Sequence, residues 1–373
     1  MYAVVVDDAG TMQWQEVPDP VPGPGEVLIK VAATSVNRAD LLQRQGFYPP
    51  PPGASDIMGL ECSGTIVDLG PDELDIPRTH SNLTARIAQF QLGDEVCALL
   101  AGGGYAELVA VPVGQVMRLP IGMDLVVAGS LPEVACTAWS NLVNVAGLTE
   151  GQTVLIHGGA GGVGSHAIQL AKSLGATVAV TAGTDDRVQW CLDLGADIGI
   201  NYNDEDFVEH VIKATADTTK GANVILDNMG AKYLERNVSA LANDGKLVVI
   251  GMQGGIKAEL NIGQLLGKRG AVFATSLRSR PLTQKAQICH EVSDTVWPLI
   301  ANGKVDPIVS GELPIQEVNE AHSIVENEHP RGKVILVVDR PEPRADAPGP
   351  TARLRESFKD RDRLFPRMNR KNS

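Results

Sequence analysis

Residues 153–164 read Thr-Val-Leu-Ile-His-Gly-Gly-Ala-Gly-Gly-Val-Gly, a strand-like run followed at once by a glycine-rich turn. The turn has the spacing Gly159-x-Gly161-x-x-Gly164, and a helical pattern begins at Ser165. A GxGxxG run between a strand and a helix is typical of a loop that binds the pyrophosphate of a dinucleotide. The free N–H groups at the start of such a helix bind the phosphates. This stretch therefore predicts a βαβ unit with a dinucleotide site.

Each glycine of the turn has an expected physical role. We expect Gly159 to permit the tight turn, Gly161 to let the pyrophosphate approach the backbone, and Gly164 to let the helix pack closely on the strand. Gly162 and Val163 complete the predicted phosphate loop. The alternative is a glycine-rich loop without a ligand.

Strand-like and helical segments alternate on the carboxyl side of this loop. Strands are predicted at Thr153–His157, Thr177–Thr181, Ile198–Asn201, Val224–Asp227, Lys246–Gly251 and Ala271–Ser276, and helices at Ser165–Leu174, Asp185–Leu194 and Phe207–Ala214. Alternation of this kind predicts parallel βαβ units, and hence an α/β fold with a doubly wound parallel sheet of the Rossmann type. Further on, helices are predicted at Ala286–Ile300 and Val318–Glu326 and a strand at Lys333–Val338.

The chain before the loop is rich in β-strand patterns. Strands are predicted at Val27–Ala33, Gly59–Gly70, Asp94–Leu100 and Tyr105–Val113, and a helical pattern at Asp124–Val145. Tyr48–Gly53 contains four prolines, which exclude a helix or regular sheet there. Pro71–Gln91 has no clear period and is predicted to be a long loop.

Composition excludes several classes of protein. The 373 residues carry a net charge of −13, which disfavours non-specific binding to nucleic acid. The segment 341–373 has nine Lys/Arg against five Asp/Glu, so a basic, disordered tail is expected there, with a short helix possible at Ala352–Leu364. Five widely spaced cysteines predict neither disulfides nor a zinc knuckle. We find no signal peptide and no membrane span, and expect a soluble, cytoplasmic protein.

The end of the second predicted strand bears on the choice of cofactor. It continues as Ala182-Gly183-Thr184-Asp185-Asp186-Arg187. An NAD site usually has an acid about 20 residues past the glycines, but Asp185 and Asp186 fall in the first turn of the next helix, where an acid is favoured by the helix dipole. Gly183 and Arg187 leave room and charge for a 2′-phosphate, so we favour NADP(H) over NAD.

A glycine loop in mid-chain after a β-rich domain resembles the medium-chain dehydrogenase/reductase superfamily. In its zinc alcohol dehydrogenases, a Cys follows the third strand and a Gly-His-Glu motif supplies further ligands. Here the first motif reads Ser35-Val36-Asn37-Arg38-Ala39-Asp40 and the second Gly59-Leu60-Glu61, so Asn37 and Leu60 replace the ligands. A leucine cannot bind zinc, and the four-cysteine lobe is missing. We therefore expect no metal site.

The remaining motifs resemble the zinc-free quinone oxidoreductases, especially the p53-inducible quinone oxidoreductase-like subgroup. The matching runs are Asn37-Arg38-Ala39-Asp40-Leu41, Gln43-Arg44-Gln45-Gly46, Pro50-Pro51-Pro52-Gly53-Ala54-Ser55, Gly102-Gly103-Gly104, Leu226-Asp227 and Thr275-Ser276-Leu277-Arg278-Ser279-Arg280. The resemblance implies a GroES-like catalytic domain over 1–122, a cofactor domain over 123–277, a return to the catalytic domain over 278–340 and the tail over 341–373. The subgroup often has a Lys near Asp186, where this chain has an acid.

The resemblance also implies roles for individual residues. Residues implied to line the cofactor path are Gly161 to Gly164 at the pyrophosphate, Gly183, Thr184 and Arg187 at the 2′-phosphate, Tyr202 near the adenine, Asn228, Gly251 and Met252 along the ribose and nicotinamide, and Ser276 and Leu277 near the carboxamide. Tyr48 and Asn37 would face the nicotinamide from the substrate side. Lys333 could reach a cofactor phosphate, or equally be a solvated surface charge.

Without a metal, the protein must work by positioning its cofactor and substrate. Tyr48 or Asn37 could stabilise the oxygen charge on a quinone that accepts a hydride. Alternatively, Tyr48 only packs on its loop and Asn37 is a turn residue bonded to its own backbone. The seven histidines form no catalytic pattern; His157 is expected to support the glycine loop, and Cys136 to lie in the core.

Three functions compete. The first is NADPH-dependent quinone reduction; the second is NADPH-dependent reduction of the C=C bond of an alkenal or enone; the third is a non-catalytic, NADPH-binding structural or RNA-binding role. The basic tail keeps the RNA reading open. We also expect a homodimer, because Ala271–Ser276 should form an exposed sheet edge that needs cover.

Overall fold

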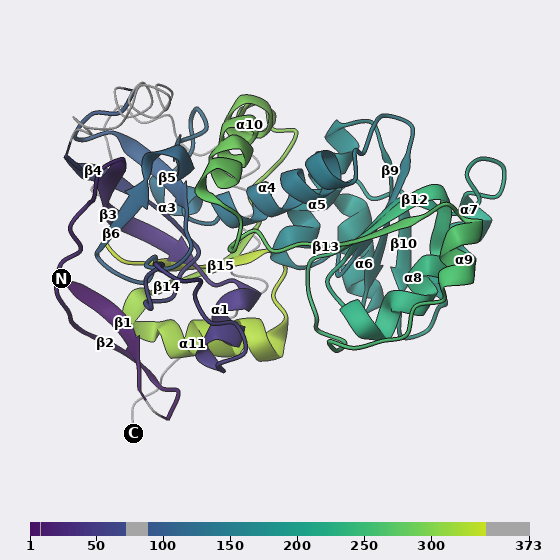
Figure 1. The fold of residues 1–373 in the computed structure, drawn as a ribbon, viewed down its shortest axis with the longest axis horizontal. Helices are drawn as coiled ribbons and strands as arrows, with labels where there is room; N and C mark the ends of the chain where they lie inside the picture. The colour runs from purple at the N-terminus through teal and green to yellow at the C-terminus, as the bar shows by residue number, and fades with distance from the viewer. Residues whose placement is uncertain (8, 72–88, 341–373) are drawn as a thin grey trace.

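The computed structural model describes residues 1–7, 9–71 and 89–340. Most of the predicted Pro71–Gln91 loop and the whole predicted tail, 341–373 with its short helix, lie outside the described residues. Figure 1 shows two lobes side by side, one built on a parallel sheet and the other on a mainly antiparallel sheet. None of the described helices combines the length and apolar character needed to cross a membrane.

The cofactor-side lobe holds the predicted doubly wound sheet. Within the described residues its six parallel strands follow the order β10 (Ile198–Asn201), β9 (Thr177–Ala182), β8 (Thr153–His157), β11 (Ala222–Asp227), β12 (Leu241–Val249) and β13 (Ala271–Ala274). The strand order reverses direction between β8 and β11, and in such sheets ligands bind at the carboxyl ends of the strands beside this point. The fold class predicted from the sequence is therefore confirmed.

Helices connect these strands and flank the sheet. They are α5 (Gly162–Ser173), α6 (Asp185–Asp193), α7 (Phe207–Ala214), α8 (Leu234–Ala240) and α9 (Ile262–Gly267). The predicted bounds of β8, β10 and α7 are confirmed to the residue. The largest shift is in β12, which begins at Leu241 instead of Lys246. The polar Asn243 and Asp244 interrupt the apolar run, so the sequence pattern does not indicate that the strand begins at Leu241.

The second lobe is built on a seven-stranded sheet of the described residues. Its strands run in the order β14 (Val309–Pro314), β15 (Lys333–Val337), β3 (Glu26–Ser35), β4 (Glu61–Leu69), β5 (Glu95–Leu99) and β7 (Val116–Arg118), with β6 (Leu108–Pro112) also paired to β3. β1 (Tyr2–Val6) and β2 (Met12–Glu16) form a separate hairpin, and α1 (Arg38–Arg44) follows β3. Because β14 and β15 follow the cofactor sheet in the chain, the return segment completes the sheet begun by the N-terminal residues.

The segment between the lobes differs from the single helical pattern predicted at Asp124–Val145. It forms α3 (Leu125–Ala128), α4 (Pro132–Trp139) and a π-helical turn, η3 (Ser140–Val145). Pro132 has no N–H and clashes with a preceding helical turn, so a new helix has to start there. α10 (Leu282–Ala301) packs against α4 and β7 and joins the same large apolar core.

The predicted helix Val318–Glu326 is likewise divided. α11 (Val318–Ser323) is followed by a π-helical turn, η6 (Ile324–Glu328), which ends at His329 with a φ of 49°. β15 then begins at Lys333 and pairs with β14 and β3 in the sheet of the second lobe.

Candidate active site

The phosphate cradle, residues 158–164, connects β8 to α5. Its positive φ lies at Gly158 (+68°), so Gly158 makes the tight turn and the role expected for Gly159 was wrong. A Cβ on Gly159 would lie 3.1 Å from Cys191 Sγ and from Val180 Cβ, so this glycine permits close packing on the neighbouring strand and helix. A Cβ on Gly164 would lie 2.3 Å from Gly158 O, which agrees with close approach of helix and strand. Around a Cβ on Gly161 the space is open to 3.6 Å, as a passing phosphate requires.

The return segment lies directly on this cradle. Gly332 N–H donates to Ala160 O at 3.1 Å, and Gly161 and Gly332 form a parallel bridge. A Cβ on Gly162 would lie 2.6 Å from Lys333 Cδ. The structure therefore places Lys333 beside the first residue of α5, and its side chain is buried instead of solvated.

The residues expected at the adenosine end come together around Gly183. A Cβ on Gly183 would lie 2.6 Å from the Tyr202 hydroxyl. Both Asp185 and Asp186 occupy the first turn of α6, as predicted. Asp186 accepts a hydrogen bond from the Thr184 hydroxyl and forms an ion pair with Arg331.

Two arginines lie beside the first turn of α6. Arg187 donates to Glu328 O at 3.0 Å, and the Arg331 guanidinium lies 5.9 Å from the centre of the Trp190 ring. Hydrogen bonds from Thr184 and the ion pair with Arg331 lower the pKa of Asp186. Asp186, the acid that weakens the expectation of NADPH, thus forms its ion pair with Arg331, which lies two residues before β15.

Asn228 lies at the carboxyl end of β11, next to the point where the strand order reverses. Its Oδ1 is buried and has no hydrogen-bond partner among the described residues. A Cβ on Gly158 would lie 2.5 Å from Asn228 Nδ2, and one on Gly251 would lie 2.7 Å from Asn228 O. A buried acceptor without a donor is costly, so it fits a group that a ligand supplies.

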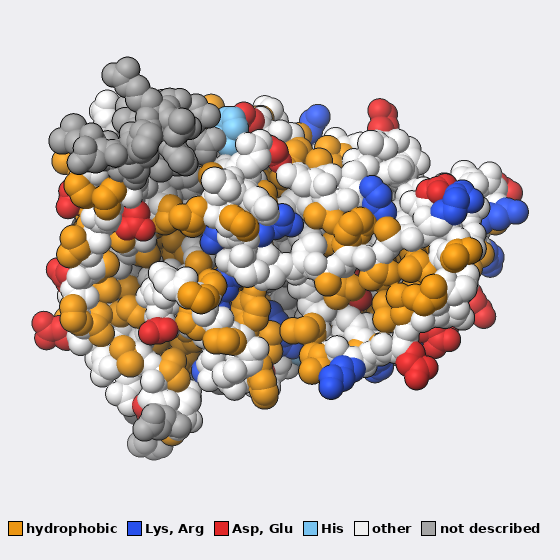
Figure 2. Space-filling view, in the orientation of Figure 1, with side chains coloured by type: hydrophobic (Ala, Val, Ile, Leu, Met, Phe, Trp, Pro, Cys, Tyr) orange, Lys and Arg blue, Asp and Glu red, His pale blue; other side chains and the backbone are white. Residues whose placement is uncertain are grey.

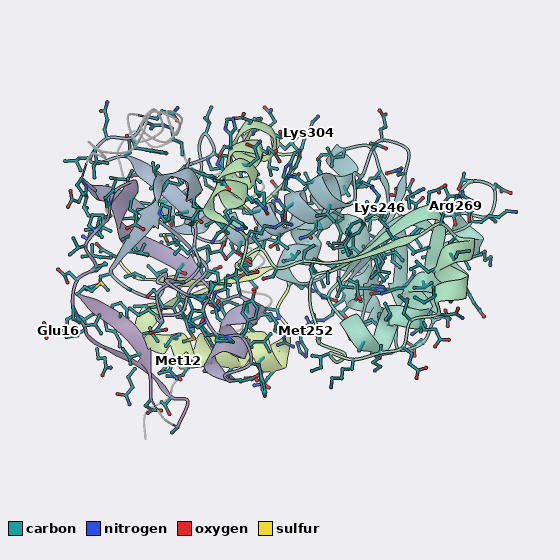
Figure 3. The ribbon with its side chains drawn as sticks, viewed as in Figure 1. Met12, Glu16, Lys246, Met252, Arg269 and Lys304 are labelled. Carbon is teal, nitrogen blue, oxygen red and sulfur yellow. The ribbon has the colours of Figure 1, made fainter. Side chains whose placement is uncertain are left out.

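The cradle and this acceptor fit a dinucleotide. The first N–H groups of α5 have no intrahelical acceptor, as at the start of any helix, and Asn228 Oδ1 is free to accept a hydroxyl or amide hydrogen bond from a ligand. Met252 is half exposed and lies where the two lobes meet (Figure 3). Leu277, by contrast, is buried in the large core.

Tyr48 reaches the cofactor-side lobe from the proline-rich loop. Its hydroxyl lies 2.8 Å from Ser276 Oγ, just beyond β13. Arg278 fixes this arrangement, because it donates to Tyr48 O at 3.1 Å, to Gln43 Oε1 at 2.8 Å and to Ala101 O at 2.7 Å. Burial raises the pKa of Tyr48, so its hydroxyl stays protonated and can act as a donor.

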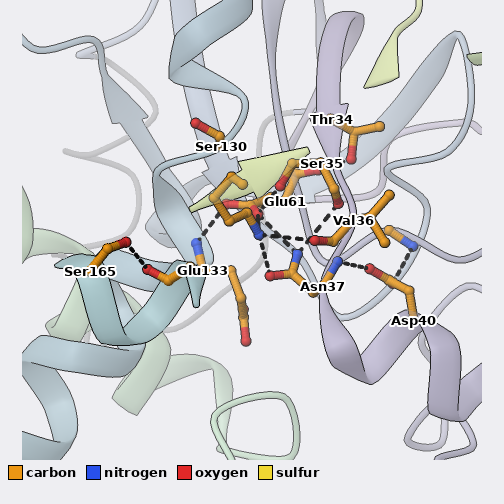
Figure 4. Close-up of polar contacts among 12 residues, drawn as sticks. Thr34, Ser35, Val36, Asn37, Asp40, Glu61, Ser130, Glu133 and Ser165 are labelled. Carbon is orange, nitrogen blue, oxygen red and sulfur yellow. Dashed lines mark hydrogen bonds and ion pairs between the residues drawn. The ribbon is translucent and has the colours of Figure 1, made fainter. Parts of the chain in front are cut away.

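A buried polar cluster of Ser35, Asn37, Glu61 and Lys333 lies between α1 and the cradle (Figure 4). Lys333 Nζ lies 2.9 Å from Glu61 Oε1 and also donates to Asn37 Oδ1. Asn37 Nδ2 donates to the same Glu61 oxygen at 2.9 Å, and the Ser35 hydroxyl donates to it as well. The Asn37 amide is thus bonded at both ends, and its predicted contact with a substrate remains a prediction.

The positions that carry zinc ligands in the resembling dehydrogenases hold Asn37 and Leu60. Leu60 is 1% exposed, and the described residues contain no group of three or more His, Cys, Asp or Glu that could hold a metal ion. The absence of zinc remains a prediction that rests on the chemistry of these two side chains.

The histidine and cysteine expectations agree with the structure. Buried His157 bonds Thr181 Oγ1 at 3.0 Å and Asn237 Oδ1 at 2.7 Å, directly below the cradle. Burial lowers the pKa of His157 to about 4. Cys136 is fully buried in the core.

Sequence reasoning missed four side chains of the site. They are Glu61, Glu133, Arg278 and Arg331. Glu61 and Arg278 lie in motifs that carry the family resemblance, Glu133 follows Pro132 in an apolar helical stretch, and Arg331 lies two residues before Lys333. A charge at an otherwise apolar position was the available signal, since charged side chains are rarely buried unless they are paired.

Comparisons with known proteins cover both lobes. Residues 23–121 match the family model described as alcohol dehydrogenase GroES-like domain, and residues 162–293 match the one described as zinc-binding dehydrogenase. Quinone oxidoreductase from Mus musculus is 28% identical over 86% of this chain and 91% of the relative. A 2-haloacrylate reductase from Burkholderia sp is 28% identical over 90% of this chain and 98% of the relative.

Solved structures agree. A mycobacterial protein in complex with NADPH superimposes with a TM-score of 0.77 at 27% identity, over 91% of this chain and all of that one. Escherichia coli quinone oxidoreductase in complex with NADPH has a TM-score of 0.74 at 26% identity, over 90% and 99%. Both lobes, their connection and the glycine cradle are accounted for by one family: the chain belongs to the medium-chain dehydrogenase/reductase family of oxidoreductases.

Proposed function

We propose that this chain transfers a hydride from NADPH to a quinone without the help of zinc. The observation that carries the proposal is the hydrogen bond between Tyr48 and Ser276, because it brings a hydroxyl donor of the substrate-side loop to the end of the cofactor sheet. The two relatives named as quinone oxidoreductases support the same acceptor class.

NADPH supplies the hydride when it is bound, so the chain's own residues have to orient the acceptor and exclude water. The Tyr48 hydroxyl, released from Ser276, donates to the acceptor oxygen on which negative charge develops. Asn37 acts through the cluster, where it holds Glu61 and Lys333 in place. Arg278 keeps Tyr48 at the cleft.

NADPH is favoured over NADH for electrostatic reasons. Asp186 is already paired with Arg331, and Arg187 lies one residue further along α6, so two cationic groups lie near Gly183. Guanidinium groups suit a 2′-phosphate, whereas a free acid at this place would repel it.

The second candidate is reduction of an activated C=C bond, and one observation favours it: the similarity to a 2-haloacrylate reductase. NADPH oxidation is therefore measured side by side with a quinone and with an alkenal. Turnover of the quinone alone supports the proposal, and turnover of the alkenal alone supports the second candidate. Tight NADPH binding without turnover of either would leave the non-catalytic role.

We also propose that two copies of this chain form a homodimer through the face that carries β13. Large apolar side chains on and near β13 are exposed: Phe273 (37%), Ile262 (62%) and Leu266 (74%). Figure 2 shows hydrophobic side chains gathered on the face that carries β13 and α9. An exposed edge strand with an apolar surround is typically covered by a second chain.

A further inference from the structure

Glu133 is a carboxylic acid of the cleft that the proposed hydride transfer does not yet use. It lies in the first turn of α4, directly after Pro132, at the junction of the two lobes. Its main-chain N–H donates to Glu61 Oε2 at 2.9 Å, which fixes the start of the helix against the buried polar cluster. In Figure 4 the dashed line to Glu133 ends at this nitrogen.

The Glu133 carboxyl itself has no hydrogen-bond or ion-pair partner among the described residues. A carboxylate that is partly removed from water and receives no donor from the protein loses part of its solvation, so the neutral form is favoured. Burial raises the pKa of Glu133 to about 8, with a further rise from the Glu61 charge that Lys333 only partly opposes. The helix dipole would stabilise the anion, but burial outweighs it.

Charged and titratable groups from several elements interact with the charge of Glu133. Those whose charge acts on it or responds to it are Glu61 on β4, Asp40 on α1, Lys333 on β15, Tyr48 on the proline-rich loop, Arg278 beyond β13, Lys285 on α10 and Cys136 on α4. Glu133 therefore lies beside the polar cluster, within electrostatic reach of Tyr48 and Arg278, at the junction of the two lobes.

We infer that Glu133 is the proton donor of the reaction, an inference that rests on the proposed function. A quinone that gains a hydride becomes a hydroquinone anion, while NADPH is oxidised to NADP⁺. The Glu133 O–H bond then breaks, its proton goes to the anionic oxygen, and the electron pair stays on the carboxylate. Water restores the proton before the next turnover. With an alkenal, the same proton goes to the carbon next to the carbonyl group.

The test compares wild type with Glu133→Gln and a matched control, Glu209→Gln. Glu209 also lies in the first turn of a helix, but it is exposed on α7 in the other lobe. A positioned general acid contributes about a hundredfold or more, so kcat of Glu133→Gln should fall by about that factor while the NADPH dissociation constant stays within about twofold. The wild-type kcat should decline above about pH 8, and this limb should vanish in the variant.

A measurement without cofactor separates the acid from a structural role. Because the folded state binds a proton that the unfolded state releases, the Glu133 contribution to stability falls as pH rises from about 4.5 to about 8. As pH rises from about 4.5 to about 8, the melting temperature of Glu133→Gln should therefore rise relative to that of wild type. Glu209→Gln should show no such relative rise.

The outcomes are distinct. Absence of wild-type turnover with both acceptors overturns the proposed function and the proton transfer with it. Wild-type turnover that Glu133→Gln retains within about twofold, or a loss of kcat with an unchanged alkaline limb, overturns the assignment of Glu133 alone. An equal gain in melting temperature at every pH would also contradict it, since the carboxyl would not titrate in the window.

Discussion

The Tyr48 hydroxyl lies 2.8 Å from Ser276 Oγ, although 228 positions separate the two residues in the chain. One comes from the loop after α1 and the other from the residue that follows Thr275 at the end of the cofactor sheet. Each hydroxyl satisfies the other, so the pair joins the proline-rich loop to the end of the cofactor sheet.

Tyr48→Phe should lower kcat by about a hundredfold, the usual cost of removing one donor from a developing oxyanion. NADPH affinity should hardly change, because the lost hydroxyl acts on the acceptor. Ser276→Ala provides the contrast: it leaves the Tyr48 hydroxyl free and should mainly raise the NADPH dissociation constant. Steady-state kinetics and NADPH fluorescence titration measure the two effects. Full activity of Tyr48→Phe would show that the Tyr48 hydroxyl has no role in the reaction and that the ring only packs on its loop.

Arg331→Ala and Arg187→Ala should each weaken NADPH binding about tenfold and leave NADH binding unchanged, because a charged hydrogen bond contributes about 1.5–3 kcal/mol. Asp186→Asn should act in the opposite direction, since it releases Arg331 from its ion pair. Titrations with both nucleotides test this. An unaltered preference in both arginine variants would show that the 2′-phosphate site lies elsewhere.

Arg278→Met should destabilise the protein by about 3 kcal/mol, because three acceptors lose their donor. Arg280→Met is the control, since its guanidinium makes one long bond of 3.3 Å to Gln284. Urea unfolding measures the difference. Activity of Arg278→Met should fall as well, because Tyr48 is no longer held at the cleft. A loss below 1 kcal/mol would indicate that the loop is fixed by other contacts.

Leu266→Glu should convert a dimer into a monomer without loss of fold, because Leu266 is 74% exposed and its replacement opens no cavity. Light scattering at micromolar concentration should give twice the chain mass for wild type and the single mass for the variant. Ile121→Glu, at a residue 89% exposed on the other lobe, should remain a dimer. Wild type that is already monomeric would contradict the assignment of this face.

The contribution of the buried histidines to stability should decrease as pH falls from about 6.5 towards 4. Burial lowers the pKa of His157 and His166 to about 4 and that of His322 to about 3, so the unfolded chain takes up protons that the folded one excludes. His166→Gln should remove its share of this contribution, because among the described residues His166 Nε2 is buried without a hydrogen-bond partner. Urea midpoints of wild type and the His166→Gln variant at a series of pH values measure the difference.

The strand–glycine–helix pattern made much of the cofactor lobe predictable, because each βαβ unit is specified by local periodicity. β8, β10 and α7 were placed to the residue for this reason. The role of Gly159 was not, since Gly158 and Gly159 are the same residue type and only the end of β8 at His157 decides which one turns. Similarly, the break at Pro132 was visible, but the π-helical turn after Trp139 leaves no mark in the sequence.

The sequence indicated single residues of the candidate site but not the hydrogen bonds and ion pairs between them. Tyr48, Ser276, Asn37 and Lys333 were each singled out, yet nothing in their spacing indicated that the first two bond each other and the last two share Glu61. Such contacts depend on how the return strand β15 pairs with β3, which is a property of the whole fold. Glu61 and Arg278 were not predicted as site residues, because other residues of the same motifs carry the roles that the family resemblance implies.

The hydrogen bond from Gly332 N–H to Ala160 O ties residues 331–333 to the glycine loop. Any displacement of one segment relative to the other has to break this bond or move both segments together. Because Lys333 follows Gly332 directly, the same two neighbouring residues join the glycine loop to the buried ion pair with Glu61.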